Sequence, residues 1–289
     1  MSAEVLHNSD SAEWIAQDAP PAGTLELLWL GQAGFVLKTH GHTLVIDPYV
    51  SDSLAEKYRG REFSHQRMME PPISPQCLAE ASVDMLFSTH AHTDHLDPGT
   101  LREVYSTSET PIFIGPRSAA ETAAQRGVPL KKMVLLDAEE QFLRTDVHVT
   151  ALASAHEQLS RDECGNHLYL GYVISIGGIR IYHSGDAVPY EGLARRLAKL
   201  EIDIALLPVN GRDAYRSDRG IPGNFTIQEA CTLIREGNIG FWVPHHFGMF
   251  AFNSEDPKRI REVIEGEGFV QMNQWLLPEP GVIYRWSRA

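Results

Sequence analysis

Cysteines and long hydrophobic runs are what this sequence has least of. The 289 residues include only three cysteines, Cys77, Cys164 and Cys231, and none forms a CxxC pair. This excludes a disulfide-rich scaffold and is typical of a reducing compartment, so we expect a cytoplasmic protein. No stretch approaches the roughly 18 consecutive apolar residues of a membrane-spanning helix, and the first residues are acidic and polar rather than basic and then apolar. We therefore expect neither a membrane anchor nor a signal peptide.

Basic residues are also in the minority. The chain has 25 lysines and arginines against 38 aspartates and glutamates, which gives a net charge of −13 with histidine neutral. Nucleic-acid backbones and anionic membranes attract proteins that carry a basic stripe or patch, so this composition argues against both partners. The hydrophobic share of 43% and the charged share of 22% are those of a globular protein long enough to bury a full core.

The order of the apolar segments predicts one α+β domain preceded by an arm. Residues 1–24 are polar and end in a proline- and glycine-rich stretch, so we expect a surface arm there and a single domain over residues 25–289. Short apolar strands separated by glycine follow from Leu25, and helices begin at the N-caps Asp97 and Thr226. Strands in meanders with interspersed helices fit two sheets packed face to face and covered by helices.

The strongest chemical signal is a cluster of four metal-binding side chains within six residues. The segment His90-Ala91-His92-Thr93-Asp94-His95 directly follows an apolar strand. Because side chains two apart in extended backbone lie on the same face, the imidazoles of His90 and His92 can bind one first-row metal ion. The chain then turns toward a predicted helix, so Asp94 and His95 can reach a second ion. The alternative is a histidine-rich surface loop, which the position directly after a core strand disfavours.

This segment resembles the HxHxDH signature of the metallo-β-lactamase superfamily. That superfamily consists of hydrolases with a four-layer αββα sandwich and a metal centre at one sandwich edge, so the resemblance implies this fold and this position of the site. It extends from Trp29 to about Pro257 and includes Tyr182-His183-Ser184-Gly185-Asp186 and Pro244-His245-His246. One branch, the L-ascorbate-6-phosphate lactonase-like proteins, is similar in Phe113-Ile114-Gly115-Pro116 and Arg219-Gly220-Ile221. The N-acyl-phosphatidylethanolamine phospholipase D group resembles the chain more distantly.

The resemblance implies a dinuclear centre of two divalent ions. It assigns the first ion to His90, His92 and His156. It assigns the second to Asp94, His95 and His246, with Asp186 bridging the two. Asp94 also receives a catalytic role, because it would orient the attacking hydroxide. The alternative for His156 is an ordinary surface histidine. The lactonase likeness suggests manganese, whereas a histidine-rich site by itself suggests zinc.

Three more residues are candidates for supporting the ligands. Adjacent strand residues face opposite ways, so only one of His245 and His246 can be a ligand. The Pro-x-His spacing favours His246 and leaves His245 in the core or behind a ligand. His183, three residues before Asp186, is either a packed strand histidine or a partner of a ligand. Asp47 ends a strand and can accept the outer N–H of a ligand histidine, or cap the following turn.

The expected reaction is hydrolysis. A hydroxide shared by two divalent ions is a nucleophile at neutral pH, and no GxSxG motif supplies a protein nucleophile. We expect a small ester-like substrate, above all a lactone or sugar-phosphate lactone. Two alternatives stay open: a phosphodiesterase or phospholipase-D-like hydrolase of the same superfamily, and a di-iron oxidoreductase or non-catalytic metal-binding protein on the same fold. The acidic charge disfavours nuclease-like enzymes, and the complete ligand set disfavours a protein without catalysis.

Three arginines are candidates for binding the substrate. Arg212, Arg216 and Arg219 follow an apolar strand in a loop that would border the metal edge, and guanidinium groups suit phosphate or carboxylate. The alternative is that they pair with neighbouring aspartates; Arg219 is preferred because it also matches the lactonase-like branch. The expected partner is a small molecule, phosphorylated ones included, and a homo-oligomer is left open. The segments Met68–Pro72 and Phe247–Phe252 either wall the pocket or belong to the core.

Overall fold

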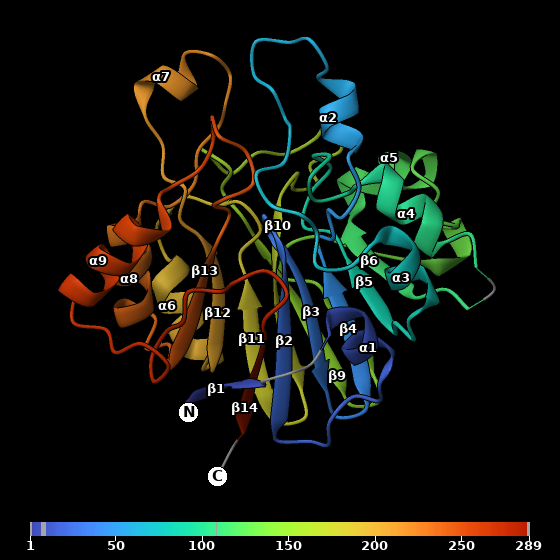
Figure 1. Ribbon diagram of the computed structural model, residues 1–289, viewed down its shortest axis with the longest axis horizontal. Helices are drawn as coiled ribbons and strands as arrows, with labels where there is room; N and C mark the ends of the chain where they lie inside the picture. Colours follow the sequence, from blue (N-terminus) through green and yellow to red (C-terminus); the bar gives the residue numbers. More distant parts are fainter. Residues whose placement is uncertain (1, 7–9, 108, 288–289) are drawn as a thin grey trace.

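Two β-sheets pack face to face, and helices cover the outer face of each (Figure 1). The computed structural model describes residues 2–6, 10–107 and 109–287 of the chain. The layers confirm the α+β, four-layer αββα sandwich that the sequence predicts. No helix within these ranges is long and apolar enough to cross a bilayer.

The larger sheet is built around the predicted meander. The strands from residue 24 to residue 46 pair antiparallel with one another, and three further strands extend the sheet in parallel. In spatial order the sheet contains β1 (Ala3–Leu6), β14 (Ile283–Ser287), β2 (Thr24–Gly31), β3 (Gly34–Thr39), β4 (His42–Ile46), β5 (Met85–Phe87), β6 (Ile112–Pro116) and β7 (Met133–Leu136).

The smaller sheet combines antiparallel and parallel pairs. Its order is β13 (Phe241–His245), β12 (Ile204–Pro208), β11 (Ile179–His183), β10 (Leu170–Ile176), β9 (Val147–Ala153) and β8 (Gln141–Arg144). The predicted two-residue hairpin joins β10 to β11 through Gly177 and Gly178. Both glycines have positive φ, 58° and 80°, as a primed turn requires.

Helices lie on both outer faces and start where the sequence predicts. Asp97 accepts hydrogen bonds from the backbone N–H groups of Gly99 and Thr100, and Thr226 forms a capping box with Glu229. The larger sheet is covered by α1 (Ser11–Ala16), α3 (Pro75–Glu80), α4 (Pro98–Val104) and α5 (Ala120–Gln125). The smaller sheet is covered by α6 (Leu193–Leu200), α8 (Ile227–Glu236) and α9 (Pro257–Gly266), and two short 3-10 helices span Arg117–Ala119 and Leu130–Lys132.

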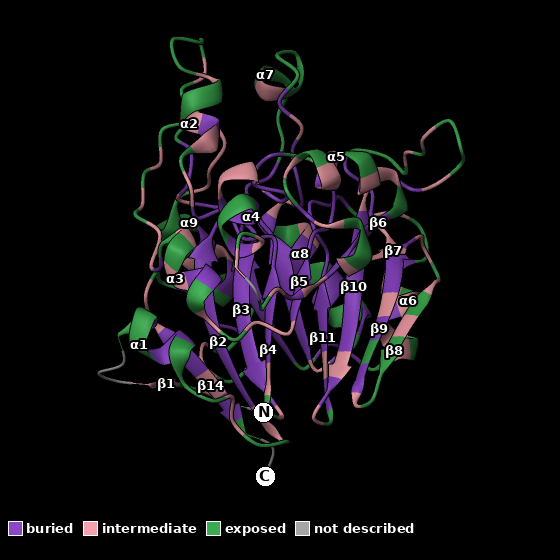
Figure 2. Ribbon diagram, turned by 90° about the vertical axis from the view of Figure 1, so that its right-hand side faces the viewer, coloured by how far each residue is buried: buried purple, intermediate pink, exposed green. Residues whose placement is uncertain are grey.

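Apolar side chains fill the space between the two sheets. The rings of Trp29, Phe35, Phe87 and Tyr172 are fully buried there, and Figure 2 shows the central strands of the two sheets as almost continuously buried. Burial of large aromatic side chains is the main stabilising contribution to such a core. The sandwich is therefore a firm support for the loops along its edge.

The N-terminal segment is built into the larger sheet, which differs from the surface arm that the sequence predicts. Strand β1 pairs antiparallel with β14, and helix α1 buries Trp14 and Ile15. The indole N–H of Trp14 donates to Glu26, and the buried ammonium group of Lys38 donates to the carbonyl of Trp14. Two buried side chains in a polar stretch give little periodicity to detect. Residues 1 and 7–9 of the predicted arm lie outside the described residues.

Two segments project beyond one edge of the sandwich, at the top of Figure 1. One carries α2 (Ser53–Lys57) and the other carries α7 (Ala214–Ser217). Arg67 holds the base of the first segment, because its guanidinium donates to the carbonyls of Tyr49, Ser51 and Met69 at 3.1 Å each.

Candidate metal centre

The loop between β5 and α4 carries the cluster that the sequence singles out. Its backbone consists of bends and turns rather than the extended strand end that we expect from the sequence, since β5 stops at Phe87. The hydroxyl of Ser88 donates to the carbonyls of His90 and His95, which folds the loop back on itself. Arg126, at the end of α5, adds hydrogen bonds to the carbonyls of Ala91 and Leu96. The side chains therefore converge because hydrogen bonds to the backbone carbonyls fold the loop, and not because the loop continues the strand.

Three histidines of the first predicted group come together. His90, His92 and His156 each offer a ring nitrogen, and these nitrogens lie within 4.8 Å of one another. Nε2 of His90 is 3.0 Å from Nδ1 of His92. Both ring nitrogens of His156 are buried without a hydrogen-bond partner among the described residues. Buried polar atoms without partners are rare, and here they face other potential metal ligands.

The second predicted group also comes together, beside the first. One ligand atom from each of Asp94, His95 and His246 lies within 4.8 Å of the others. Oδ2 of Asp186 lies between the two groups: it is 3.4 Å from Nε2 of His95, 3.2 Å from Nε2 of His246 and 4.0 Å from Nε2 of His156. This is the position that a bridging carboxylate would occupy.

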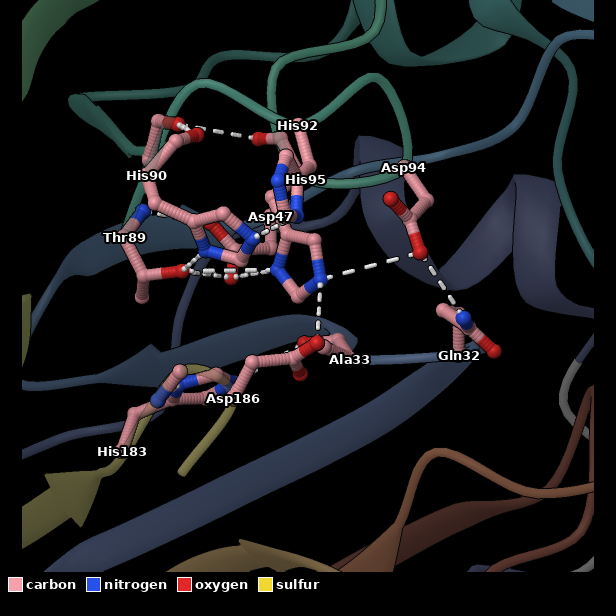
Figure 3. Close-up of polar contacts among 12 residues, drawn as sticks. Gln32, Ala33, Asp47, Thr89, His90, His92, Asp94, His95, His183 and Asp186 are labelled. Atoms are coloured by element: carbon pink, nitrogen blue, oxygen red, sulfur yellow. Dashed lines mark hydrogen bonds and ion pairs between the residues drawn. The ribbon is translucent and has the colours of Figure 1, made fainter. Parts of the chain in front are cut away.

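A buried carboxylate supports His95 from behind (Figure 3). Oδ2 of Asp47 lies 2.6 Å from Nδ1 of His95, and Asp47 also accepts hydrogen bonds from the backbone and the hydroxyl of Thr89. The sequence predicts that Asp47 can accept the outer N–H of a ligand histidine, and the structure places it for that role. Donation from Nδ1 leaves Nε2 of His95 free on the side of Asp186.

The two adjacent histidines at the end of β13 take different places. His246 has a left-handed backbone with φ of 62°, which turns its ring toward Asp186. His245 is buried in the core, stacked on His183 at 5.0 Å and packed edge-on against Phe35. His183 acts on the site through the backbone, because its Nδ1 accepts the N–H of Gly185, directly before Asp186.

Three side chains near the ligands were not predicted from the sequence. The amide of Gln32 donates to Oδ2 of Asp94 at 2.8 Å and lies 3.0 Å from Nε2 of His246. The ring of Tyr169 packs 5.0 to 5.9 Å from the rings of His90, His92 and His156. Arg126 bonds the loop carbonyls as described above. The glycine pair around Gln32, Gly31 and Gly34, is the one local signal that marks a tight turn there.

The electrostatics of the cluster put His156 and Asp186, but not His95, in the protonation states that metal binding requires. Burial lowers the pKa of His156 to about 4, so its ring is neutral at neutral pH. Burial alone would raise the pKa of Asp186, but His246 and His95 hold it well below its usual value. Burial would likewise lower the pKa of His95, but the carboxylates of Asp186, Asp47 and Asp94 raise it well above its usual value. A cation would displace that proton, because ligation needs a free Nε2.

The residues fit a site for divalent transition-metal ions. Imidazole nitrogens and carboxylate oxygens are the ligands that zinc and manganese accept, and no thiolate takes part among the described residues. The unpartnered Nε2 atoms of His95 and His156, together with Oδ1 of Asp186, are buried atoms that a cation would satisfy.

A cavity of about 920 Å³ opens over these ligands. His92, Asp94, His156, Asp186 and His246 line it on one side. The segments that carry α2 and α7 supply its walls, together with Phe250 and Phe252. Two segments were candidates for the cavity wall. Phe247–Phe252 contributes to it, and residues 68–72 are not among the described lining residues.

The predicted arginines separate into two kinds. Arg219 lines the cavity, and its guanidinium lies 3.8 Å from the ring centre of Tyr215. Arg212 and Arg216 are not among the described residues that line the cavity. Arg212 forms a two-pronged ion pair with Glu229 at 2.6 Å, and Arg216 pairs with Asp213 at 2.6 Å. These two guanidinium groups fix the loop and the start of α8. This is the alternative stated from the sequence, in which the arginines pair with neighbouring acidic residues.

Comparison with known proteins agrees with this geometry. Residues 42–247 match the family model described as the β-lactamase superfamily domain. A metal-dependent hydrolase of Polynucleobacter asymbioticus is 30% identical over 227 residues, 70% of this chain and 71% of that protein. A Salmonella paratyphi B protein named a probable L-ascorbate-6-phosphate lactonase is 23% identical over 88% of this chain and 78% of that one.

A solved structure extends the comparison to the fold. The isothiocyanate hydrolase from Delia radicum gut bacteria superposes with a TM-score of 0.70 at 19% identity, covering 91% of this chain and 100% of that chain. At this identity the likeness supports the fold alone. The chain belongs to the β-lactamase superfamily and, within it, to the metal-dependent hydrolases.

Proposed function

We propose that the protein hydrolyses a lactone or a closely related small ester, sugar-phosphate lactones included, with two divalent ions of zinc or manganese. The observation that carries the proposal is the place of Asp186. Its Oδ2 lies within 4.0 Å of a ring nitrogen from each of the two ligand groups, beside the cavity. The probable lactonase named above is a relative over most of the chain, and it supports this choice of substrate.

The chain's own residues would orient the reaction. Bound divalent ions would supply a nucleophilic water and polarise the carbonyl of the substrate. In lactone hydrolysis the oxygen of water bonds to the carbonyl carbon and the ring C–O bond breaks. The new carboxylic acid releases one proton of water at neutral pH, and the other proton of water ends on the new hydroxyl group. Asp94 would accept and orient that water proton. Burial would raise the pKa of Asp94, but His95 and other histidines lower it, so the carboxylate is ionised at neutral pH. The amide of Gln32 holds it in place.

Cations on the cavity wall support an acidic substrate. Lys57, Arg61 and Arg219 line the cavity and are exposed, so an incoming phosphate or carboxylate can reach them. Arg126 also lines the cavity, but its guanidinium is occupied by loop carbonyls. The low cysteine content supports a cytoplasmic location for such an enzyme.

A substrate panel tests the proposal. The metal-loaded full chain should hydrolyse lactones, and Arg61→Gln should raise KM severalfold for phosphorylated or carboxylated lactones while leaving neutral lactones unchanged. Arg59→Gln is the matched control, since Arg59 is exposed but does not line the cavity. Turnover of phosphodiesters without turnover of lactones would overturn the lactonase assignment in favour of the phosphodiesterase alternative. Turnover of neither class would contradict both.

A further inference from the structure

Five aromatic rings form one continuous wall of the cavity. Tyr58, Phe63, His65, Phe250 and Phe252 all line it. The imidazole of His65 stacks on Tyr58 with ring centres 4.0 Å apart and an angle of 18°. The same imidazole lies 4.7 Å from the ring of Phe252 and 5.1 Å from that of Phe250, and Phe63 lies 5.3 Å from Phe252. We call these five residues the aromatic wall.

The aromatic wall is fixed from behind rather than free to move. Phe250 belongs to a buried cluster with Tyr49, Leu54 and Met249, and Tyr58 and Phe252 pack against that cluster. The Nδ1 of His65 lies 3.0 Å from the carbonyl of Phe63, which orients the imidazole. A fixed apolar surface needs little ordering when a flat group lies against it, so it can bind such a group tightly.

The wall differs in chemistry from the rest of the lining. Three cations of the lining, Lys57, Arg61 and Arg219, are exposed side chains. The aromatic wall itself is mainly apolar: four of its rings are half-buried and that of Phe250 is buried, and Nδ1 of His65 lies against the carbonyl of Phe63. A sugar or another fully polar group would leave its hydrogen-bonding groups poorly matched on this side.

We infer that the substrate is a lactone or ester with a flat apolar substituent, such as an aryl group, that lies against the aromatic wall while its carbonyl meets the His/Asp cluster. This inference rests on the proposed function, and it narrows the substrate class. Ring–ring contacts in offset or edge-on geometry stabilise such a complex beyond simple burial. The product of lactone hydrolysis is a hydroxy acid, and the exposed cations Lys57, Arg61 and Arg219 can pair with its carboxylate.

Matched lactones test the inference through catalysis. The metal-loaded full chain should show a kcat/KM for γ-phenyl-γ-butyrolactone at least about tenfold above that for γ-butyrolactone. Phe252→Leu and Phe63→Ala should each lower kcat/KM for γ-phenyl-γ-butyrolactone more than kcat/KM for γ-butyrolactone, which reduces this preference. Phe142→Leu is the control, because Phe142 is a half-buried phenylalanine on β8 and is not part of the cavity lining. Equal rates on both lactones would overturn the inference and leave the proposed function intact.

Binding of the products separates the two proposals. Calorimetry should show that 4-hydroxy-4-phenylbutyrate binds at least about tenfold more tightly than 4-hydroxybutyrate, and that Phe252→Leu removes the difference. If no lactone is hydrolysed but this binding difference and its loss are seen, the aromatic wall is a subsite and the proposed reaction is wrong. If both products bind equally in the wild-type protein, the aromatic wall is not a substrate subsite.

Discussion

Nδ1 of His95 lies 2.6 Å from Oδ2 of Asp47, and both side chains are completely buried. Asp47 is itself held by two hydrogen bonds from Thr89. The carboxylate therefore fixes both the orientation and the tautomer of the imidazole, so that Nε2 faces Asp186. A ligand histidine of the second group is prepared by a residue 48 positions away in the sequence.

Removing the charge of Asp47 should weaken metal binding. In Asp47→Asn an amide replaces one of the two oxygens that accept from Thr89 and His95, so the imidazole loses its fixed tautomer. We expect metal affinity to fall by about 10- to 100-fold in competition titrations with a chelating dye. Asp52→Asn, at an exposed aspartate whose side chain forms no helix-cap hydrogen bond, is the control and should leave the affinity unchanged. Unaltered affinity in a folded Asp47→Asn protein would contradict this role.

The number of bound ions should follow the two ligand groups. Elemental analysis of the wild-type protein should give two divalent ions per chain. His92→Ala and His246→Ala each remove a ligand from a different group, so each should leave about one ion. His148→Ala, an exposed histidine outside both groups, should keep two. One ion in the wild-type protein would show that the two groups form a single site.

Gln32 should act as a positioning residue for Asp94. Its amide donates to Oδ2 of Asp94 and lies beside Nε2 of His246, so Gln32→Ala frees the carboxylate to rotate. We expect kcat to fall by about 10- to 100-fold with a smaller change in KM, by analogy with other groups that orient metal ligands. Gln76→Ala, at an exposed glutamine whose amide donates to Glu80, supplies the comparison. A change in KM alone would indicate that Gln32 contacts the substrate instead.

The metal-free protein should lose stability below neutral pH. Burial lowers the pKa of His156 to about 4 and that of His90 well below its usual value, whereas a histidine in the unfolded chain titrates near about 6.5. The unfolded chain therefore binds more protons between pH 6.5 and about 4, and the free energy of unfolding falls across that window. The pKa of His95 is raised in the folded state, so protonation of His95 contributes its full stabilisation at every pH below about 6.5. This contribution is constant across the window and does not oppose the fall in the free energy of unfolding.

Thermal unfolding of the chelated protein measures this effect. Tm should be several degrees lower at pH 5 than at pH 7, and His156→Asn should show a smaller difference. An equal or higher Tm at pH 5 would contradict the burial of neutral histidines.

Local patterns predicted much of the fold. The antiparallel meander after residue 24 follows from short apolar runs between glycines, and the N-caps Asp97 and Thr226 were recognisable because capping depends on neighbours within three residues. Strand β8 was missed, since only Phe142 among its four residues is even half-buried. An edge strand with exposed side chains carries little of the alternation that marks a strand.

Sequence motifs indicated the candidate ligands and three supporting candidates, Asp47, His183 and His245, but not Gln32, Tyr169 or Arg126. The histidines and aspartates lie in motifs that the sequence shows, whereas Gln32 reaches Asp94 across 62 positions and Arg126 reaches the carbonyl of Ala91 across 35. Such contacts depend on how the strands and helices pack. The same reason explains Arg212: its attachment to Glu229 becomes visible only when the loop is placed beside α8.

The most direct test of the account is the rate of lactone hydrolysis before chelation, after chelation and after return of zinc or manganese. The two ligand groups around Asp186 predict that activity disappears with the metal and returns with it, while the protein stays folded throughout. A chelated, metal-free protein that keeps its full rate would contradict the central claim.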